Sequence, residues 1–268
     1  MKELSLEELK EIELDILKMF DSFCKENNIQ YFLAYGTLLG AIRYKKFIPW
    51  DDDVDILVPR ADYDRLMSLF QDSETYCLYA FERNRKYRFP FAKLCDMRTR
   101  LTETVYPNNG VELGVGIDIF PLDHWDDDFD KAKKEAIRIG RDIARLGWTK
   151  IDKPRTNNPV KYVVWSAVLA YCKMRGSEHY IKKIIKACKK AEQNESRYVG
   201  AKAWTIYLER GIIPAEAFAD TVEIEFEGKM FPAPIGYDTY LTCLYGDYLP
   251  EPPKEKQKTH HSFVAYKR

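Results

Sequence analysis

The chain has 268 residues, of which 46% are hydrophobic and 31% charged, and its 42 basic and 42 acidic residues cancel. This size and composition predict a globular protein with one α/β core and an appended part, and the balanced charge argues against nucleic-acid binding. The six cysteines form no CxxC pair or zinc-like spacing, and the N-terminus is charged, with no apolar signal segment. We therefore expect reduced thiols and a cytoplasmic protein.

The first predicted element is a long helix over residues 5–26. Its apolar positions recur at helical spacing, so one face is suited to burial. Ser5, followed three residues later by Glu8, matches a capping box, which satisfies free backbone N–H groups at a helix start. The helix is expected to begin directly after Ser5.

Two strands with a short helix between them are predicted next. Residues 29–36 are typical of a buried strand ending at Gly36, and the following short helix, residues 37–44, has Thr37 as its N-cap candidate. Residues 53–58 alternate acidic and aliphatic side chains and predict another strand, which a proline then ends. Further along, we expect a helix at 60–70 and strands at 76–82, 89–96, 101–105 and 115–120.

The second half of the chain is predicted to be mostly helical. From residue 130 to about 195 it is lysine-rich, with breaks at Lys153-Pro154 and Arg175-Gly176. The last part predicts a hairpin, a short helix and a proline-rich tail. The expected fold class is therefore α/β (α+β), a mixed sheet flanked by helices with a helical appendage. The three expected parts are a core at 1–125, a helical region at 126–200 and a C-terminal part at 201–268 that packs back on the core.

The longest apolar run extends from Tyr162 to Cys172, about half the length that a bilayer requires. We expect a buried helix here rather than a membrane span. Basic residues follow the run closely, which leaves open an interfacial helix on anionic lipid at the inner face of the membrane.

Four acids, Asp51, Asp52, Asp53 and Asp55, lie just before or at the start of the strand at 53–58. Residues i and i+2 of a strand face the same way, so Asp53 and Asp55 are expected to project together. Their repulsion is relieved if a divalent cation binds between them, and carboxylate oxygens favour Mg²⁺ or Mn²⁺. The alternative is a solvated turn at a strand edge, and Asp51 and Asp52 need not face the same ion.

Two further features favour a phosphate and metal site. Asp118 lies in an alternating apolar strand, where a carboxylate without a partner would be costly to bury, so it is a candidate third metal ligand or base. Gly36-Thr37 is predicted at a strand-to-helix junction, where free N–H groups can hold a phosphate.

This combination resembles the nucleotidyltransferase superfamily, and whole phrases resemble the LicD family within it. The family includes bacterial phosphocholine transferases and is related to fukutin-type phosphoribitol transferases. One departure is visible: the family usually has Arg-His-x-Gly where this chain has Arg43-Tyr44-Lys45-Lys46, which puts any role of that histidine and glycine in doubt. The matching phrases are YGTLLGAIRYKKFIPWDDDVDI, GIDIFPLD and YLTCLYGDYLPEPP, followed by His260-His261.

The resemblance implies transfer of phosphocholine from CDP-choline to a glycan hydroxyl with release of CMP. The acceptor would be a teichoic acid or lipopolysaccharide-type precursor, which could be lipid-linked. Asp53, Asp55 and Asp118 would hold Mg²⁺ or Mn²⁺ and form the catalytic set, with Asp118 a further metal ligand or the proton acceptor.

Further residues are candidates for substrate binding. Arg43 and Lys93 are candidates for phosphate oxygens, and Trp50 for stacking on cytosine, although surface, salt-bridge or wedging roles fit these three as well. The aromatic residues Tyr35, Tyr106 and Trp125 are candidates for the choline headgroup, and His260 or His261 for a proton carrier or phosphate contact.

Three other functions remain open. The donor could be CDP-ribitol or CDP-glycerol, the chain could be a noncatalytic scaffold of glycan assembly, or it could add a nucleotide with release of pyrophosphate.

Overall fold

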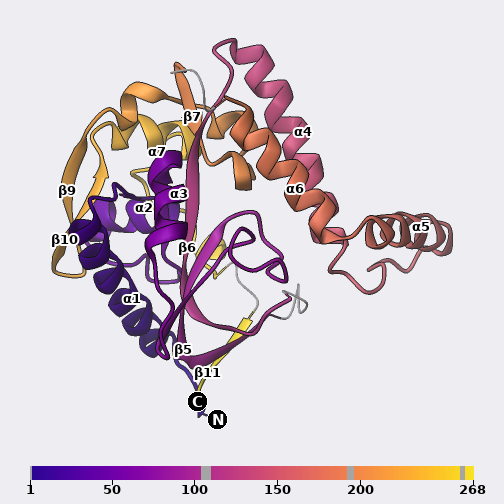
Figure 1. The fold of residues 1–268 in the computed structure, drawn as a ribbon, viewed down its shortest axis with the longest axis horizontal. Coiled ribbons are helices and arrows are strands. Elements are labelled where there is room, and N and C mark those ends of the chain that lie inside the picture. The colour runs from indigo at the N-terminus through magenta and orange to yellow at the C-terminus, as the bar shows by residue number, and fades with distance from the viewer. Residues whose placement is uncertain (1, 104–109, 192–195, 260–262) are drawn as a thin grey trace.

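The computed structural model describes residues 2–103, 110–191, 196–259 and 263–268 (Figure 1). His260, His261 and Tyr106 lie outside these residues. The helices are α1 (Leu6–Asn27), α2 (Tyr35–Tyr44), α3 (Arg60–Leu69), α4 (Phe129–Trp148), α5 (Pro159–Arg175), α6 (Ser177–Cys188) and α7 (Tyr237–Tyr245). Short 3₁₀ helices are η1 (Lys189–Ala191), η2 (Lys202–Trp204), η3 (Leu208–Gly211), η4 (Ala215–Phe218) and η5 (Lys254–Lys256).

The described residues form one nine-stranded mixed sheet and a separate two-stranded hairpin. The strands are β1 (Lys2–Glu3), β2 (Phe32–Leu33), β3 (Asp55–Pro59), β4 (Tyr76–Tyr79), β5 (Ala92–Glu103), β6 (Leu113–His124), β7 (Tyr198–Gly200), β8 (Ile213–Pro214), β9 (Thr221–Phe226), β10 (Lys229–Pro234) and β11 (Phe263–Lys267). The main order is β1-β11-β5-β6-β3-β2, with β4 on β5, β7 on β6 and β8 on β7. The pair β3 and β6 is parallel, and its neighbouring pairs are antiparallel. The expected α/β class is confirmed.

The start of α1 agrees with the sequence prediction, but the start of α2 does not. Both hydrogen bonds of the capping box between Ser5 and Glu8 are present. Helix α2 begins at Tyr35 after the cap residue Ala34, which has no side-chain cap bond, so the strand predicted to reach Gly36 is only two residues long. Thr37 is not the N-cap, because its hydroxyl accepts a hydrogen bond from the Asp55 N–H (2.8 Å).

The two strands predicted at 89–96 and 101–105 are one strand, β5, with an irregular register between Asp96 and Leu101. Thr99 bridges this irregularity because its hydroxyl donates to the Asp96 carbonyl (2.6 Å) and accepts from the Val115 N–H (2.8 Å). The predicted break is therefore a bulge inside a continuous strand.

The predicted proline-rich tail is followed by a strand, β11, that sequence reasoning missed. Strand β11 pairs with β5, and β1 pairs with β11, so the two termini lie side by side (Figure 1). The predicted C-terminal hairpin is confirmed as β9 and β10, joined by Glu227 and Gly228, both with positive φ.

Two main hydrophobic clusters fill the molecule. The larger one surrounds the sheet and includes residues of α1, α2, β3, β6, β10 and α7, so the C-terminal part packs on the core. The second joins Trp125 to the inner faces of α4 and α6. The three sequence boundaries stay a prediction.

Helix α5 is not the buried helix that its apolar sequence predicts. Within it only Leu169 and Cys172 are buried, while most of its large apolar side chains are exposed. Figure 1 shows why: α5 projects beyond α4 and α6, away from the sheet. No helix in the described part of the chain is long and apolar enough to cross a membrane.

A buried ion pair joins helix α3 to strand β6 of the sheet. Arg60, at the start of α3, donates from Nε (2.7 Å) and Nη2 (3.1 Å) to the two carboxylate oxygens of Asp123 in β6. Asp123 is fully buried and Arg60 nearly so. Such a pair is costly to break because the remaining charge would stay buried.

Replacing Asp123 with asparagine should therefore lower the free energy of unfolding by about 3 kcal/mol, because Arg60 would lose its counter-charge inside the protein. Urea denaturation at pH 7 measures this. The matched control is Glu178→Gln, which breaks the exposed pair with Lys182 and should leave the free energy of unfolding almost unchanged. Equal losses in the two variants would contradict the structural role of the Arg60–Asp123 pair.

Candidate functional site

Three charged residues form a row across the centre of the sheet. Asp55 of β3 is the register partner of Asp118 in β6, and Asp118 is the partner of Lys93 in β5. Neighbouring strands lie about 4.8 Å apart, so residues paired in this way are close neighbours on one face. Lys93 Nζ lies 2.6 Å from Asp118 Oδ1. The row therefore places two carboxylates and one ammonium side by side.

Asp53 lies just before β3, not within it. The pairing of the strands nevertheless extends past Asp55, because the Asp118 N–H donates to the Val54 carbonyl (2.9 Å). Val54 is buried, whereas Asp53 and Asp55 are both half-buried. This alternation agrees with the expectation that Asp53 and Asp55 share a face.

The first turn of α2 lies against the acidic turn. A Cβ added to Gly36 would be 2.5 Å from Oδ2 of Asp51. The close approach of Asp51 therefore explains why residue 36 is a glycine. Phosphate binding by Gly36 and Thr37 stays a prediction. Because Asp51 lies against the start of α2, its position differs from that of the pair Asp53 and Asp55.

The electrostatics of the row are unbalanced toward negative charge. Burial, followed by the charges of Asp53 and Asp118, raises the pKa of Asp55 well above its usual range. Burial disfavours the ammonium of Lys93, yet the adjacent Asp118 carboxylate holds the pKa of Lys93 above its ordinary value. In the row itself two carboxylates, Asp55 and Asp118, share the single ammonium of Lys93, so a further cation would be stabilised here.

The donor set suits a divalent cation in kind, since Asp53, Asp55 and Asp118 supply only hard oxygen ligands. The side chains are not yet arranged as a ligand set: across the described ranges, no group of three or more His, Cys, Asp or Glu residues is placed to hold a metal. Lys93 takes one oxygen of Asp118 in this arrangement. The negative charge of the three aspartates and their positions on the strands therefore fit a metal ion, whereas the conformations of their side chains in this structure do not.

Glu13 is a buried acid beside the site that sequence reasoning missed. It is 2% exposed, and its Oε2 has no hydrogen-bond partner among the residues described. Burial, followed by the Asp53 charge, raises its pKa well above the usual range. A signal was available, because Glu13 lies four residues after Leu9 and four before Leu17, on the apolar face of α1.

The turn that carries the acids is held by Lys10 of α1. Its Nζ donates to the carbonyls of Ile48 (3.0 Å) and Pro49 (3.1 Å). Trp50, next in the chain, is half-buried against the main hydrophobic cluster. The contact that Trp50 makes in the structure is packing against this cluster. Its stacking on a base stays a prediction.

Arg43 lies at the end of α2 and contacts the C-terminal loop. Its Nη2 donates to the carbonyl of Pro250 (2.8 Å) and also to that of Tyr248. Arg43 thus anchors this loop, and phosphate binding by it stays a prediction, whereas Lys93 lies directly at the acids. The suggested roles of His260 and His261 fall outside the described residues.

A group of tyrosines lies beside the acids. Tyr35 stacks on Tyr207 with ring centroids 5.6 Å apart, and Tyr240 and Tyr245 complete the group. The pKa of each phenol is raised, chiefly by burial, and the Asp55 charge contributes in all four. Of the two headgroup candidates among the described residues, Tyr35 lies in this group, whereas Trp125 belongs to the second hydrophobic cluster.

Comparison with known proteins gives two kinds of match. Residues 28–135 match the family model described as LicD/FKTN/FKRP, nucleotidyltransferase domain. The lipopolysaccharide cholinephosphotransferase LicD of Haemophilus influenzae is 31% identical over 275 residues, covering 99% of both chains. An uncharacterized protein of Rickettsia prowazekii is 37% identical over 59 residues, which is 22% of each chain. The family match covers the acidic turn, Lys93 and Asp118.

The buried acid next to the site should make the metal-free protein less stable as the pH rises. Because the pKa of Glu13 is raised in the folded state, the folded protein holds the Glu13 proton more tightly than the unfolded chain does. This contribution to stability is fully present below the unfolded pKa and is lost as the pH rises through the folded pKa. In EDTA, Glu13→Gln should therefore lose less Tm between pH 5 and pH 8 than the unmodified protein. The expected difference is roughly 2–4 °C, the effect of about 1 kcal/mol in a chain of this size.

The control is Glu11→Gln, on the exposed face of the same helix. It should have the same pH dependence of Tm as the unmodified protein. If the Tm of Glu13→Gln also falls with pH as much as that of the unmodified protein, the pKa of Glu13 is not raised by its burial.

Proposed function

We infer that this chain, which belongs to the LicD family and is a phosphotransferase, moves phosphocholine from CDP-choline to a hydroxyl of a glycan. The observation that carries the proposal is the row of Asp55, Asp118 and Lys93 with Asp53 beside it. Clustered carboxylates are typical of sites where a metal ion neutralises a phosphate-bearing substrate. The full-length similarity to a cholinephosphotransferase supports choline as the headgroup.

In the proposed reaction, an oxygen of the acceptor hydroxyl attacks the phosphorus that bears choline. The bond from that phosphorus to the oxygen of CMP breaks, CMP leaves, and the proton of the hydroxyl passes to a base. Asp53, Asp55 and Asp118 would hold Mg²⁺ or Mn²⁺, which supplies charge neutralisation at the pyrophosphate. Asp118 is either a third ligand or the proton acceptor.

Lys93 has a defined part in this proposal. Its ammonium lies 2.6 Å from Asp118, and the Lys93 side chain is only 15% exposed. The ion pair holds one oxygen of Asp118, the residue that the proposal uses as a metal ligand or a base. The same group can reach phosphate oxygens once a donor is bound, which is the role that the sequence suggests for it.

The tyrosine group beside Asp55 supports a cationic headgroup. A quaternary ammonium is held by aromatic rings, and Tyr35 and Tyr207, which stack on each other and are both half-buried, supply such rings next to the acids. Phosphocholine would place its phosphate toward the carboxylate-bound cation and its trimethylammonium toward these rings. Neither a ribitol nor a glycerol donor would gain from the rings in the same way.

The acceptor is proposed from the relative, whose name states a lipopolysaccharide product. A lipopolysaccharide-type or teichoic acid precursor offers the required hydroxyl. Transfer from CDP-ribitol or CDP-glycerol keeps the same metal site and is the second candidate. A noncatalytic scaffold is disfavoured because it has no need for three clustered carboxylates.

Loss of any one carboxylate should abolish most of the activity. Asp53→Asn, Asp55→Asn and Asp118→Asn should each slow CMP release from CDP-choline, Mg²⁺ and extracted acceptor by roughly 100-fold or more, because removing one preorganised charge at a reaction centre has this effect. The assay measures CMP. Each variant should also bind Mn²⁺ more weakly in calorimetry.

Asp152→Asn is the matched control, since the side chain of Asp152 is 91% exposed. It should retain normal activity and Mn²⁺ binding. Full activity in Asp53→Asn and Asp118→Asn, with folding verified by circular dichroism, would exclude the proposed metal site.

The donor should be identified by the stabilisation it gives in a thermal-shift panel with Mg²⁺. CDP-choline should raise Tm more than CMP, CDP-ribitol or CDP-glycerol, because only choline gains aromatic contacts. If CDP-ribitol stabilises the protein and CDP-choline does no better than CMP, the choline assignment is wrong.

The tyrosine group offers a matched pair of variants for the same panel. Tyr207→Phe keeps an aromatic face and should retain the preference for CDP-choline over CMP. Tyr207→Leu removes the face and should lose the preference while keeping the response to CMP. Equal behaviour of the two variants would place the headgroup elsewhere.

A further inference from the structure

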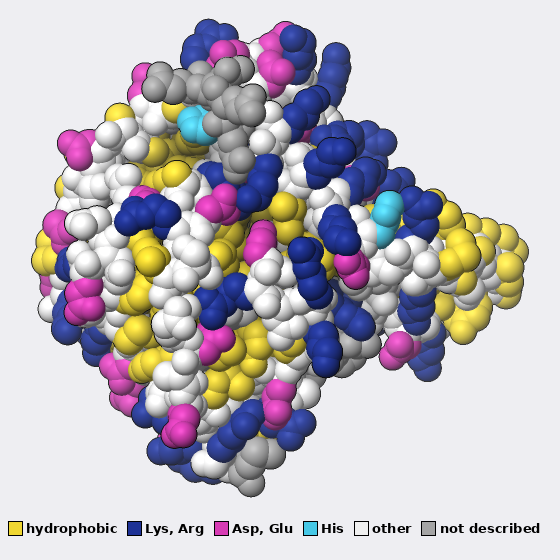
Figure 2. Space-filling model, in the orientation of Figure 1, with side chains coloured by type: hydrophobic (Ala, Val, Ile, Leu, Met, Phe, Trp, Pro, Cys, Tyr) yellow, Lys and Arg dark blue, Asp and Glu magenta, His cyan; other side chains and the backbone are white. Residues whose placement is uncertain are grey.

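Helix α5 exposes an unusual amount of apolar surface for a helix at the edge of the molecule. Val160, Val163, Val164 and Met174 are 72%, 68%, 57% and 77% exposed. Figure 2 shows this hydrophobic surface as the projecting end of the molecule, opposite the sheet. Large contiguous apolar patches on a protein surface mark interaction sites.

The aromatic residues of α5 lie on the same projecting helix. Tyr162, Trp165 and Tyr171 are each more than two-fifths exposed. Trp165 also makes an edge contact with Trp148 at the end of α4, with ring centroids 5.2 Å apart. Tyr and Trp with one wet end are typical of side chains at the boundary between lipid and water.

The segment that contains α5 is strongly basic. Residues 153–177 include five basic residues and no acidic one. This charge is local, because the whole chain has equal numbers of basic and acidic residues. The five are Lys153, Arg155, Lys161, Lys173 and Arg175.

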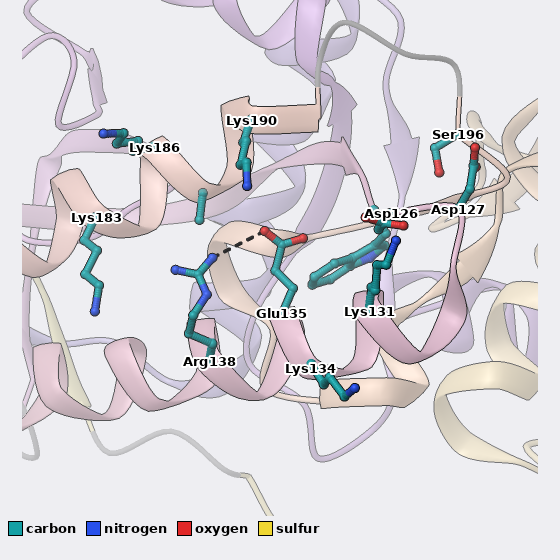
Figure 3. Close-up of a pocket in the computed structure, with 12 residues that line it drawn as sticks. Asp126, Asp127, Lys131, Lys134, Glu135, Arg138, Lys183, Lys186, Lys190 and Ser196 are labelled. Carbon is teal, nitrogen blue, oxygen red and sulfur yellow. Dashed lines mark hydrogen bonds and ion pairs between the residues drawn. The ribbon is translucent and has the colours of Figure 1, made fainter.

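Positive charge continues from α5 onto α6 and α4. A cleft of about 670 Å³ between these two helices is lined by six basic and three acidic residues. Figure 3 shows Lys183 and Lys186 on α6 and Lys131 and Arg138 on α4, the two helices that border this cleft. In Figure 2 the Lys and Arg side chains gather over this region, next to the apolar end formed by α5.

We propose that α5 is a membrane-docking helix that lies in the interface of an anionic phospholipid bilayer. Its apolar and aromatic side chains would insert at the level of the headgroups, and its basic residues and those of α6 would contact lipid phosphates. At 17 residues and with three basic side chains, α5 is suited to lie on a bilayer and not to cross it.

Charge complementarity favours a bilayer over a second copy of the chain. Two copies meeting through α5 would bring two sets of five cations together without acids in the same segment. An anionic lipid surface supplies negative charge along the whole segment and apolar contact beneath it. The inference does not depend on the choline assignment, because docking concerns a different part of the molecule.

Vesicle flotation of the full chain tests the proposal. The chain should float with vesicles of phosphatidylcholine containing 30 mol% phosphatidylglycerol and should bind pure phosphatidylcholine vesicles at least 10-fold more weakly. The triple variant Val163→Gln, Val164→Gln and Met174→Gln should bind anionic vesicles roughly 10-fold or more weakly, because it removes exposed apolar side chains from α5. Its Tm should not change, since these side chains are not packed.

Two further variants separate the contributions. Met230→Gln, Ile235→Gln and Leu249→Gln remove three comparably exposed apolar side chains outside α5 and should leave vesicle binding unchanged. Lys161→Gln should weaken binding to anionic vesicles by about 5-fold and leave binding to neutral vesicles unchanged.

Two outcomes would overturn the proposal. One is equal binding of the α5 triple variant and the unmodified chain to anionic vesicles. The other is no vesicle binding at all together with a dimer in size-exclusion chromatography that the α5 variant dissolves, which would assign the face to self-association. Neither outcome bears on CMP release, so a failed transferase proposal and a failed docking proposal are distinguishable.

Discussion

The parallel pairing of β3 with β6 sets Asp55 directly opposite Asp118, and the site is organised around this enforced proximity. Two unit charges about 5 Å apart repel by about 3 kcal/mol at an effective dielectric constant of 20. Lys93 of β5 offsets part of this repulsion by pairing with Asp118. The rest is reflected in the raised pKa of Asp55, which favours the neutral form of that carboxyl group. The remaining negative charge is what makes the site suitable for a cation and a phosphate ester.

The surrounding elements hold this unfavourable arrangement in place. Thr37 in α2 accepts from the backbone of Asp55, and Lys10 in α1 holds the carbonyls of the turn before it. Tyr35 starts α2 with a φ of 44°, a left-handed conformation that costs a residue with a side chain about 1–2 kcal/mol. That strain, like the repulsion between carboxylates, is concentrated at the proposed site, as is common where function competes with stability.

The two ends of the molecule have different physical characters. The sheet end concentrates negative charge in a half-buried site, whereas α4, α5 and α6 present positive charge and apolar side chains to the exterior. In the proposed functions these are complementary, since one end handles a nucleotide donor and the other meets an anionic surface. Arg60 and Asp123 fix α3 on β6 through a buried pair, an interaction within the sheet end that is costly to break.

Local pattern in the sequence determined the elements whose residues interact with near neighbours. The capping box of α1, the hairpin at the C-terminal end and the alternation around Asp53 and Asp55 all depend on contacts a few residues apart, and the structure has them. Three long sequence motifs indicate the family. The sequence predicts Thr37 as an N-cap, which is wrong, because the true partner of its hydroxyl, the Asp55 N–H, lies 18 residues away and leaves no local signal.

Only the tertiary structure decided which charged groups meet and which apolar residues are covered. Glu13 joins the acids because α1 packs on the sheet, Lys93 meets Asp118 because of a strand register, and β11 closes an edge from the far end of the chain. The same holds for α5, whose apolar sequence predicts burial but whose position beyond α4 and α6 leaves it exposed. Burial and charge pairing depend on long-range packing, whereas propensity and periodicity report only on neighbours along the chain.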